Sequence, residues 1–202
     1  MPTEPHTHPE DDSSGDGQQK GMSHQTAMYL RFGAMILTGM VVMYAVMYAG
    51  TYVWDHVRWS ESRLFMALTM GGTMGLVMLG WMLTMYRNLK ANIAIVAASL
   101  LLIGGGVFLD RSQVTVNGSN WMSAMIPHHS LAITRSERAT IDDVRVCRLA
   151  VEISEAQRRE IREMEWLLAD IERNGPATTA GEAAARPVPE FPAEALRDCP
   201  GG

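Results

Sequence analysis

Three long uncharged stretches dominate the first half of this 202-residue chain. They cover residues 32–53, 64–86 and 91–109. Each has about 20 residues, and a helix of that length rises about 1.5 Å per residue, which is enough to cross the hydrocarbon core of a bilayer. The pattern predicts an all-α region of three transmembrane helices over residues 27–112, in contact with membrane lipid.

Residues 119–174 have a different pattern, in which apolar positions recur at helical spacing. A first helix is predicted over residues 121–138, and a second from Asp142 or Asp143 to Arg173. The second helix carries an apolar stripe whose spacing alternates between three and four residues. Its members are Val146, Leu149, Ile153, Ala156, Met164, Leu167 and Ile171. Two helices joined by a short turn run antiparallel, so this segment is predicted to be a helical hairpin.

The two ends of the chain are polar or rich in Pro, Gly and Ala. Residues 1–26 and 175–202 are therefore predicted to be disordered. His6, His8 and His24 lie in the first tail, where they either bind metal weakly or are incidental, and we favour the second interpretation. The first uncharged stretch follows an acidic leader, so we expect an uncleaved anchor rather than a signal peptide.

Basic residues near the predicted spans indicate the topology. One side carries Lys20, Arg31, Arg87 and Lys90, and the other carries Arg58, Arg63 and Arg111. This small excess predicts an N-terminus inside and a C-terminal domain outside, in the periplasm for a multi-pass protein of a bacterial inner membrane. Cys147 and Cys199 can form a disulfide there. We favour instead a buried thiol at Cys147 and a free Cys199, because the tail around Cys199 is expected to be disordered.

The distribution of charge argues against several classes of function. The net charge is -5 and no basic face is present, which argues against nucleic-acid binding. No ionisable residue lies inside the three uncharged stretches, whereas a proton pump or ion transporter normally needs one. A ferritin-like di-iron enzyme needs Glu-x-x-His motifs, and the chain has none. We therefore expect that the protein is not an enzyme.

Methionine and glycine are frequent in the predicted spans. The second span contains Met66, Met70, Met74, Met78, Met82 and Met85. Such a stripe is either a thioether pathway for Cu(I) or adaptable packing, and we favour packing because no Cys or His accompanies it. Gly71 and Gly75 form a small-xxx-small pair, and residues 104–106 are three glycines, so we expect close packing or dimerisation of the spans.

The most informative segment reads Met122-Ser-Ala-Met125-Ile-Pro-His128-His129. Met122, Met125 and His129 share one face of a helix because of their spacing. Pro127 lacks an N–H donor, so we expect a kink just before the histidines. Thioethers and imidazoles are ligands that copper and other soft or borderline metals prefer. The segment predicts either a metal site or a core helix with methionine as filler and the histidines at its wet end.

Two polar residues, Gln157 and Glu160, interrupt the apolar stripe of the second helix. A carboxylate in such a stripe is costly unless it is paired, hydrogen-bonded or bound to a metal. Because the helices of a hairpin face each other, residues 122–129 are expected to lie opposite residues 157–164. This neighbourhood either binds a metal, which we favour, or contains a His–Glu hydrogen bond that fixes the helix register.

Residues 119–173 resemble the family known as domain of unknown function 305. The resemblance rests on the Met-Ile-Pro-His-His run followed by Glu152-Ile153-x-x-Ala156-Gln157-x-x-Glu160-Ile161-x-x-Met164-x-Trp166-Leu167. The three spans ahead of it are similar to a membrane-anchored bacterial subgroup. The resemblance implies a helical, ferritin-like fold and, for some members, periplasmic copper binding. By position, the implied ligands are Met122, Met125, His128, His129, Glu160 and Met164.

Many members of that family contain two helical pairs, whereas this chain has one. Because about sixty soluble residues bury only a small core, we expect two chains to form a homodimer with a four-helix bundle. The expected function is copper buffering, storage or hand-over to a copper-handling protein, with Cu(I) or Cu(II) as the ion. The alternative is a membrane interaction or structural module whose His–Glu network holds no metal.

Overall fold

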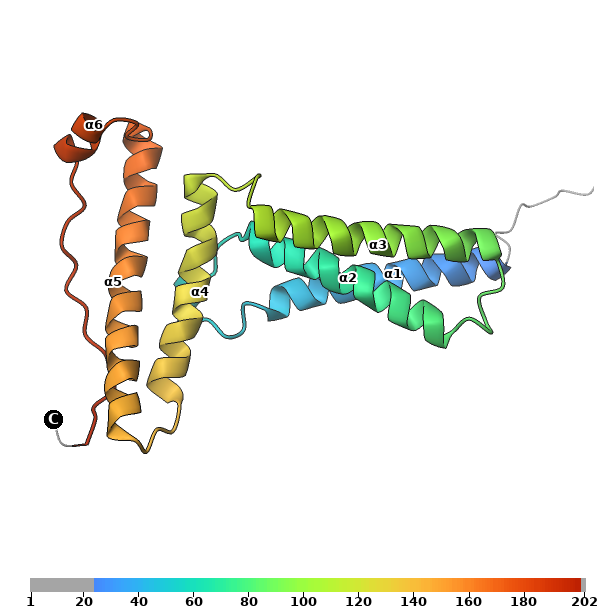
Figure 1. Ribbon diagram of the computed structural model, residues 1–202, viewed down its shortest axis with the longest axis horizontal. Coiled ribbons are helices and arrows are strands. Elements are labelled where there is room, and N and C mark those ends of the chain that lie inside the picture. Colours follow the sequence, from blue (N-terminus) through green and yellow to red (C-terminus); the bar gives the residue numbers. More distant parts are fainter. Residues whose placement is uncertain (1–23, 201–202) are drawn as a thin grey trace, which may run out of the picture.

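The computed structural model describes residues 24–200, and this part of the chain contains helices and no strands, as predicted (Figure 1). The elements are α1 (His24–Val46), a short 3-10 helix η1 (Trp54–His56), α2 (Glu61–Trp81), α3 (Leu89–Ser112), α4 (Gly118–Arg138), α5 (Val144–Asn174) and α6 (Ala180–Ala185). Most of the predicted N-terminal tail, with His6, His8 and Lys20, lies outside the described residues.

Helices α1, α2 and α3 are long and apolar enough to cross a membrane. Their ends differ from the predicted stretches: α1 begins at His24, and α2 ends at Trp81, where a turn begins. The ends differ because an uncharged stretch shows only where the sequence is apolar, whereas a capping residue sets where the helix begins. The Ser60 hydroxyl accepts a hydrogen bond from the Arg63 backbone N–H at 3.3 Å and caps α2, and Asn88 caps α3 in the same way.

The hairpin formed by α4 and α5 has clear start and stop signals. Asn117 Oδ1 accepts from the Asn120 N–H at 2.9 Å, and Asp143 Oδ1 accepts from the Arg145 N–H at 2.8 Å. Helix α5 ends before Gly175, whose φ of 76° favours glycine. The predicted hairpin is therefore present with nearly the expected ends, and its two helices pack against each other.

Small residues allow α2 to pack closely against both neighbouring helices. A Cβ atom on Gly75 would lie 2.7 Å from the Ser99 Oγ of α3, and one on Gly71 would collide with Met40 of α1. The close approach predicted at these two glycines is therefore confirmed. In the glycine triplet of residues 104–106, only Gly106 faces α2, and the other two face open space.

The hairpin has its own small core at the ends of the spans. Its buried members are Met122, Ile126, Ile133, Ile161 and Met164. Figure 1 shows that α4 runs across the ends of the three spans and that α5 lies on the far side of α4. The hairpin is thus stacked sideways on the spans instead of continuing their direction.

The loop between α1 and α2 fastens α4 to the spans. The Tyr52 backbone N–H donates to Ser130 Oγ at 2.7 Å, and His56 Nδ1 lies 2.8 Å from the same oxygen. The Leu131 side chain covers Gly50, where a Cβ atom would lie 2.6 Å from Leu131 Cδ1. Contacts between the side chains of Ser130 and Leu131 and the loop from α1 to α2 therefore hold the middle of α4 in place.

The C-terminal segment returns along the outer side of α5 (Figure 1). Arg162 Nη1 donates to the Pro192 carbonyl at 2.5 Å, and the Leu196 N–H donates to Glu137 Oε1 at 3.0 Å. Arg197 donates to the carbonyl oxygens of the last turn of α4, including Ser136 O at 2.7 Å. The composition of residues 175–202 predicted disorder and could not reveal these contacts, because most of them join side chains to backbone oxygens.

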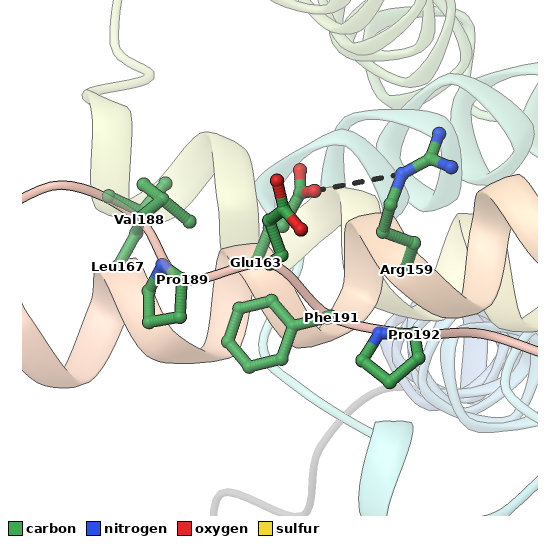
Figure 2. Close-up of a pocket in the computed structure, with 8 residues that line it drawn as sticks. Arg159, Glu163, Leu167, Val188, Pro189, Phe191 and Pro192 are labelled. Atoms are coloured by element: carbon green, nitrogen blue, oxygen red, sulfur yellow. Dashed lines mark ion pairs between the residues drawn. The ribbon is translucent and has the colours of Figure 1, made fainter.

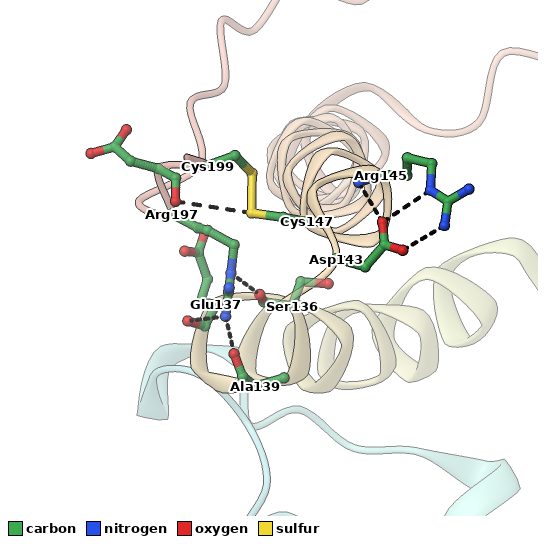
Figure 3. The surroundings of a disulfide bond; sticks show 9 residues. Ser136, Glu137, Ala139, Asp143, Arg145, Cys147, Arg197 and Cys199 are labelled. Carbon is green, nitrogen blue, oxygen red and sulfur yellow. Dashed lines mark hydrogen bonds and ion pairs between the residues drawn. A yellow bond between two sulfur atoms is a disulfide. The ribbon is translucent and has the colours of Figure 1, made fainter. Parts of the chain in front are cut away.

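Cys147 and Cys199 form a disulfide with an S–S distance of 2.07 Å (Figure 3). The interpretation that Cys147 is a buried thiol and Cys199 a free tail cysteine is therefore wrong. It relied on a disordered tail, whereas the bonds made by Arg197 place Cys199 beside the first turns of α5. The described residues contain no free cysteine.

Candidate metal centre

The central contact of the site joins His129 of α4 to Glu160 of α5. His129 Nδ1 lies 2.9 Å from the Met125 carbonyl oxygen one turn earlier, and Nε2 lies 2.8 Å from Glu160 Oε2. A carbonyl oxygen only accepts, so Nδ1 must carry a proton and donate it. That hydrogen bond orients the ring and turns Nε2 towards α5.

With Nδ1 protonated, the contact between Nε2 and Oε2 has a strict requirement. A neutral ring offers a lone pair at Nε2, and a carboxylate offers lone pairs at Oε2, so the two atoms need a proton or another cation between them. Gln157 Nε2 donates to the same carboxylate oxygen at 3.4 Å. The pair is therefore a place where one positive charge is held between a nitrogen ligand and an oxygen ligand.

The pair lies at the edge of the hairpin core. The His129 side chain is 12% exposed and the Glu160 side chain 41%, so the site is open on the Glu160 side. His128 is exposed, and its ring centroid lies 6.0 Å from that of His129. The second histidine thus stands beside the pair.

The three predicted methionines occupy different depths. Met122 and Met164 are 6% exposed and belong to the core of the hairpin, and Met125 packs partly buried against that core. The structure therefore brings His129, Glu160 and the backbone of Met125 into direct contact. Two of the thioethers lie in the core, and within residues 24–200 no group of three His, Cys, Asp or Glu gathers as a ready metal site.

Ser130, next to His129, is a support that the sequence did not reveal. Its side chain is fully buried and holds Tyr52 and His56 of the first loop, as described above. Burial lowers the pKa of the His56 imidazole, which favours the neutral ring. Ser130 Oγ accepts the Tyr52 N–H, and the tautomer of the neutral His56 ring sets whether Nδ1 accepts from the hydroxyl or donates to it. A serine inside an amphipathic helix gives no pattern from which this partner loop is predictable.

A second polar network, also missed, lies near the other end of the hairpin. Ser154 Oγ donates to Glu137 Oε1 at 2.5 Å, and Arg158 Nη2 donates to the same oxygen at 3.2 Å. The Arg158 guanidinium also lies over the Tyr52 ring, 4.9 Å from its centroid. Burial raises the pKa of the Glu137 carboxyl, but the hydrogen bonds from Ser154, Leu196 and Arg158 outweigh it, and the pKa is lowered overall.

A surface pocket lies between α5 and the C-terminal segment (Figure 2). It is lined by Arg159, Glu163 and Leu167 of α5 and by Val188, Pro189, Glu190, Phe191 and Pro192. Arg159 Nε and Glu163 Oε1 form an ion pair at 3.7 Å across its floor. None of the predicted ligands lines this pocket, so it is separate from the His129–Glu160 pair.

Comparison with known proteins gives a family for the hairpin and a viral relative. Residues 118–194, which include both hairpin helices, match the family described as domain of unknown function (DUF305). An uncharacterized protein of Acanthamoeba polyphaga mimivirus is 35% identical over 102 residues, covering 47% of this chain and 67% of the viral protein. No solved structure matches the chain.

Proposed function

Since this chain belongs to the DUF305 family, we propose that it is a membrane-anchored metal-binding protein whose hairpin holds copper. The proposed site is centred on His129 and Glu160, with the Met125 thioether as a further ligand. Its role is copper buffering, storage or hand-over to another copper-handling protein.

The orientation of His129 carries the proposal. Metal-binding histidines usually donate their second ring N–H to a backbone carbonyl or carboxylate, which fixes the ring and makes the other nitrogen a better ligand. His129 does this through Nδ1 and the Met125 carbonyl, and its Nε2 points at a carboxylate oxygen 2.8 Å away. A metal ion that replaces the intervening proton would find a nitrogen and an oxygen ligand already facing each other.

The chemistry of the neighbouring side chains favours copper. Imidazole suits copper, zinc, iron and nickel, and thioethers favour Cu(I) in particular. Met125 packs at the edge of the core one turn from His129, and His128 stands on the exposed side of the pair. The Glu160 carboxylate also suits Cu(II) or zinc, so the oxidation state depends on how many thioethers turn towards the ion.

Helices α1, α2 and α3 would anchor the protein in a bacterial inner membrane, with the hairpin in the periplasm. Two observations support this arrangement. The three helices have the length and apolarity of membrane spans. The hairpin carries the Cys147–Cys199 disulfide, a bond that persists in oxidising compartments and is rare in the cytosol.

A second copy of the chain would complete both the bundle and the site. Three large apolar side chains of α5, those of Val146, Leu149 and Ile153, are 50%, 53% and 38% exposed. They lie on the same side of α5 as Glu160, because the residues are spaced three, four and seven apart. A homodimer that buries this face would form a four-helix bundle and bring two His129–Glu160 pairs together, which supplies the ligands that one chain lacks.

Elemental analysis of detergent-purified protein after loading with Cu(I), Cu(II), Zn(II) or Fe(II) tests the proposal. Wild type is expected to retain copper, and His129→Ala and Glu160→Gln are expected to lose it while remaining folded by circular dichroism. His24→Ala, at the start of α1, is the matched control and should retain copper. Light scattering on the same samples should give the mass of a dimer.

The alternative is that the His129–Glu160 pair only fixes the helix register. It predicts no copper above the Glu160→Gln background in wild type, together with a loss of thermal stability in His129→Ala. A monomeric mass with full copper content would reject the dimer and leave the copper site in place.

A further inference from the structure

Helix α4 touches the span end of the molecule along most of its length. Near its start, Asn120 Nδ2 donates to Glu61 Oε1 of α2 at 2.6 Å. In its middle, Leu131 covers Gly50. Near its end, the Arg138 guanidinium lies 5.7 Å from the centroid of the Tyr52 ring. One side of α4 therefore faces the plane in which the spans end.

Two arginines share this side of α4. Arg135 and Arg138 follow Leu131 by four and seven residues, which places them on the same helical face. Both are exposed. Figure 1 shows that the C-terminal part of α4, where they lie, extends beyond the spans instead of covering them. Arg135 and Arg138 thus lie on the face of α4 that also carries Leu131, in the part of the helix beyond the spans.

No acidic side chain of α4 neutralises these arginines. The helix has one acidic residue, Glu137, and its carboxylate is turned towards α5, where it accepts from Ser154 and Arg158. The side of α4 that carries Leu131, Arg135 and Arg138 therefore has a net positive charge from its own residues.

The loop between α1 and α2 carries side chains that are typical of segments at a membrane surface. Trp54 is 80% exposed and Trp59 is 57% exposed, and both lie between the ends of α1 and α2. Exposed tryptophans at the ends of spans are typical of the headgroup region. Leu131 lies directly on Gly50, just beyond the end of α1, so α4 packs against the same loop that carries these tryptophans.

We propose that α4 lies on the lipid headgroups and that Arg135 and Arg138 bind the phosphate groups of anionic phospholipids. The inference rests on the membrane insertion of α1, α2 and α3 proposed above. Guanidinium groups bind phosphate oxygens in a bidentate manner and keep their charge at every physiological pH. The candidate metal pair, on the same helix, is then held at the depth of the headgroups.

Native mass spectrometry of the full chain in a neutral detergent, titrated with phosphatidylglycerol or phosphatidylcholine, tests this inference. Wild type is expected to prefer phosphatidylglycerol, by roughly 5-fold in affinity for each arginine. Arg135→Gln/Arg138→Gln should lose the preference. Arg159→Gln/Arg173→Gln removes the same charge from exposed positions of α5 and should keep it.

Three results would overturn the inference. They are a wild type without preference, a double variant that keeps the preference, and full displacement of phosphatidylglycerol by millimolar inorganic phosphate, which would indicate a site for the free anion. Carbonate extraction of cell membranes separates this failure from that of the proposed anchoring. A protein that resists extraction but shows no preference for phosphatidylglycerol has inserted spans, and its α4 does not bind the headgroups. A protein that is extracted is not inserted in the membrane. Copper content should be unchanged in both arginine variants.

Discussion

At the scale of single residues, the hairpin depends on carboxylates that are held by more than one partner. Glu160 contacts His129 and accepts from Gln157, and Glu137 accepts from Ser154, Arg158 and the Leu196 N–H. The first is half open to solvent, whereas the second has a side chain only 6% exposed. A buried carboxylate with three donors stabilises the fold only while it is charged. The two acids therefore differ in what they contribute to the stability of the hairpin.

Glu137→Gln should destabilise the hairpin by about 2 kcal/mol at pH 7, because it removes hydrogen bonds to a charged acceptor. The lowered pKa of Glu137 means that its stabilising effect is present above the ordinary value of 4.5 and is lost as the pH falls below it. The difference in the free energy of unfolding between wild type and variant should therefore shrink at acid pH. Denaturant unfolding at pH 7 and pH 4, with the exposed Glu172→Gln as control, measures it.

A difference between wild type and Glu137→Gln that stays constant with pH would mean that the carboxylate contributes through shape rather than charge. Equal destabilisation by Glu172→Gln would instead indicate a general effect of charge on the hairpin.

The pairing of His129 with Glu160 was predictable from sequence, and the support behind it was not. A carboxylate in an apolar stripe needs a partner, and antiparallel helices limit that partner to the opposite face. Ser130 offered no such constraint, because a hydroxyl inside a helix is commonly satisfied by its own backbone. Its partners Tyr52 and His56 are more than seventy residues away in sequence.

At the scale of helices, the packing of α2 against α3 depends on positions that tolerate no side chain. A Cβ atom on Gly72 would lie 2.6 Å from the Ser99 carbonyl oxygen and 3.0 Å from Leu102 Cβ. Backbone atoms on the facing helix cannot rotate away, so the helices themselves would have to separate.

Gly72→Ala should therefore destabilise the protein by about 1–3 kcal/mol, as overpacking does in a close-packed core. Gly80→Ala lies in the same helix, where a Cβ meets nothing within 4 Å, and should be neutral or slightly stabilising. Thermal unfolding of both variants in the same mild detergent compares them. Equal melting temperatures would show that α3 shifts at no cost.

The existence of all three long apolar helices and of both hairpin helices follows from hydrophobic pattern alone. The ends of the spans follow from caps such as Ser60 and Asn88, which a search for uncharged stretches overlooks, whereas the cap of α5, Asp143, was one of the two predicted starts. The spacing of Gly71 and Gly75 predicted their helix contacts correctly. The three consecutive glycines 104–106 did not indicate which of them faces a neighbouring helix.

At the scale of the whole molecule, the C-terminal segment is joined to the hairpin by the bond between Cys147 and Cys199. The bond closes a loop with a sequence separation of 52 residues. Composition predicted a free tail because it reports how much apolar surface a segment can bury, and not whether arginines and a disulfide hold the segment in place.

Cys147→Ser/Cys199→Ser should release the segment and lower stability by about 2–4 kcal/mol, in the usual range for loss of a native disulfide. Limited proteolysis should then cut residues 176–200 first, while α4 and α5 keep their helical signal in circular dichroism. Wild type treated with a reductant should behave like the double variant, and the double variant should not respond to the reductant. Unchanged proteolysis would show that the arginine contacts alone hold the segment.

The crosswise position of α4 also limits how the proposed site exchanges its ion. Because α4 is fastened at its start, middle and end, His129 cannot swing away from the span ends to meet a carrier in the bulk. A carrier anchored in the same membrane would meet it by diffusion within a plane. The rate of transfer would then follow the number of carriers per unit area of membrane, and dilution of the surrounding solution would leave it unchanged.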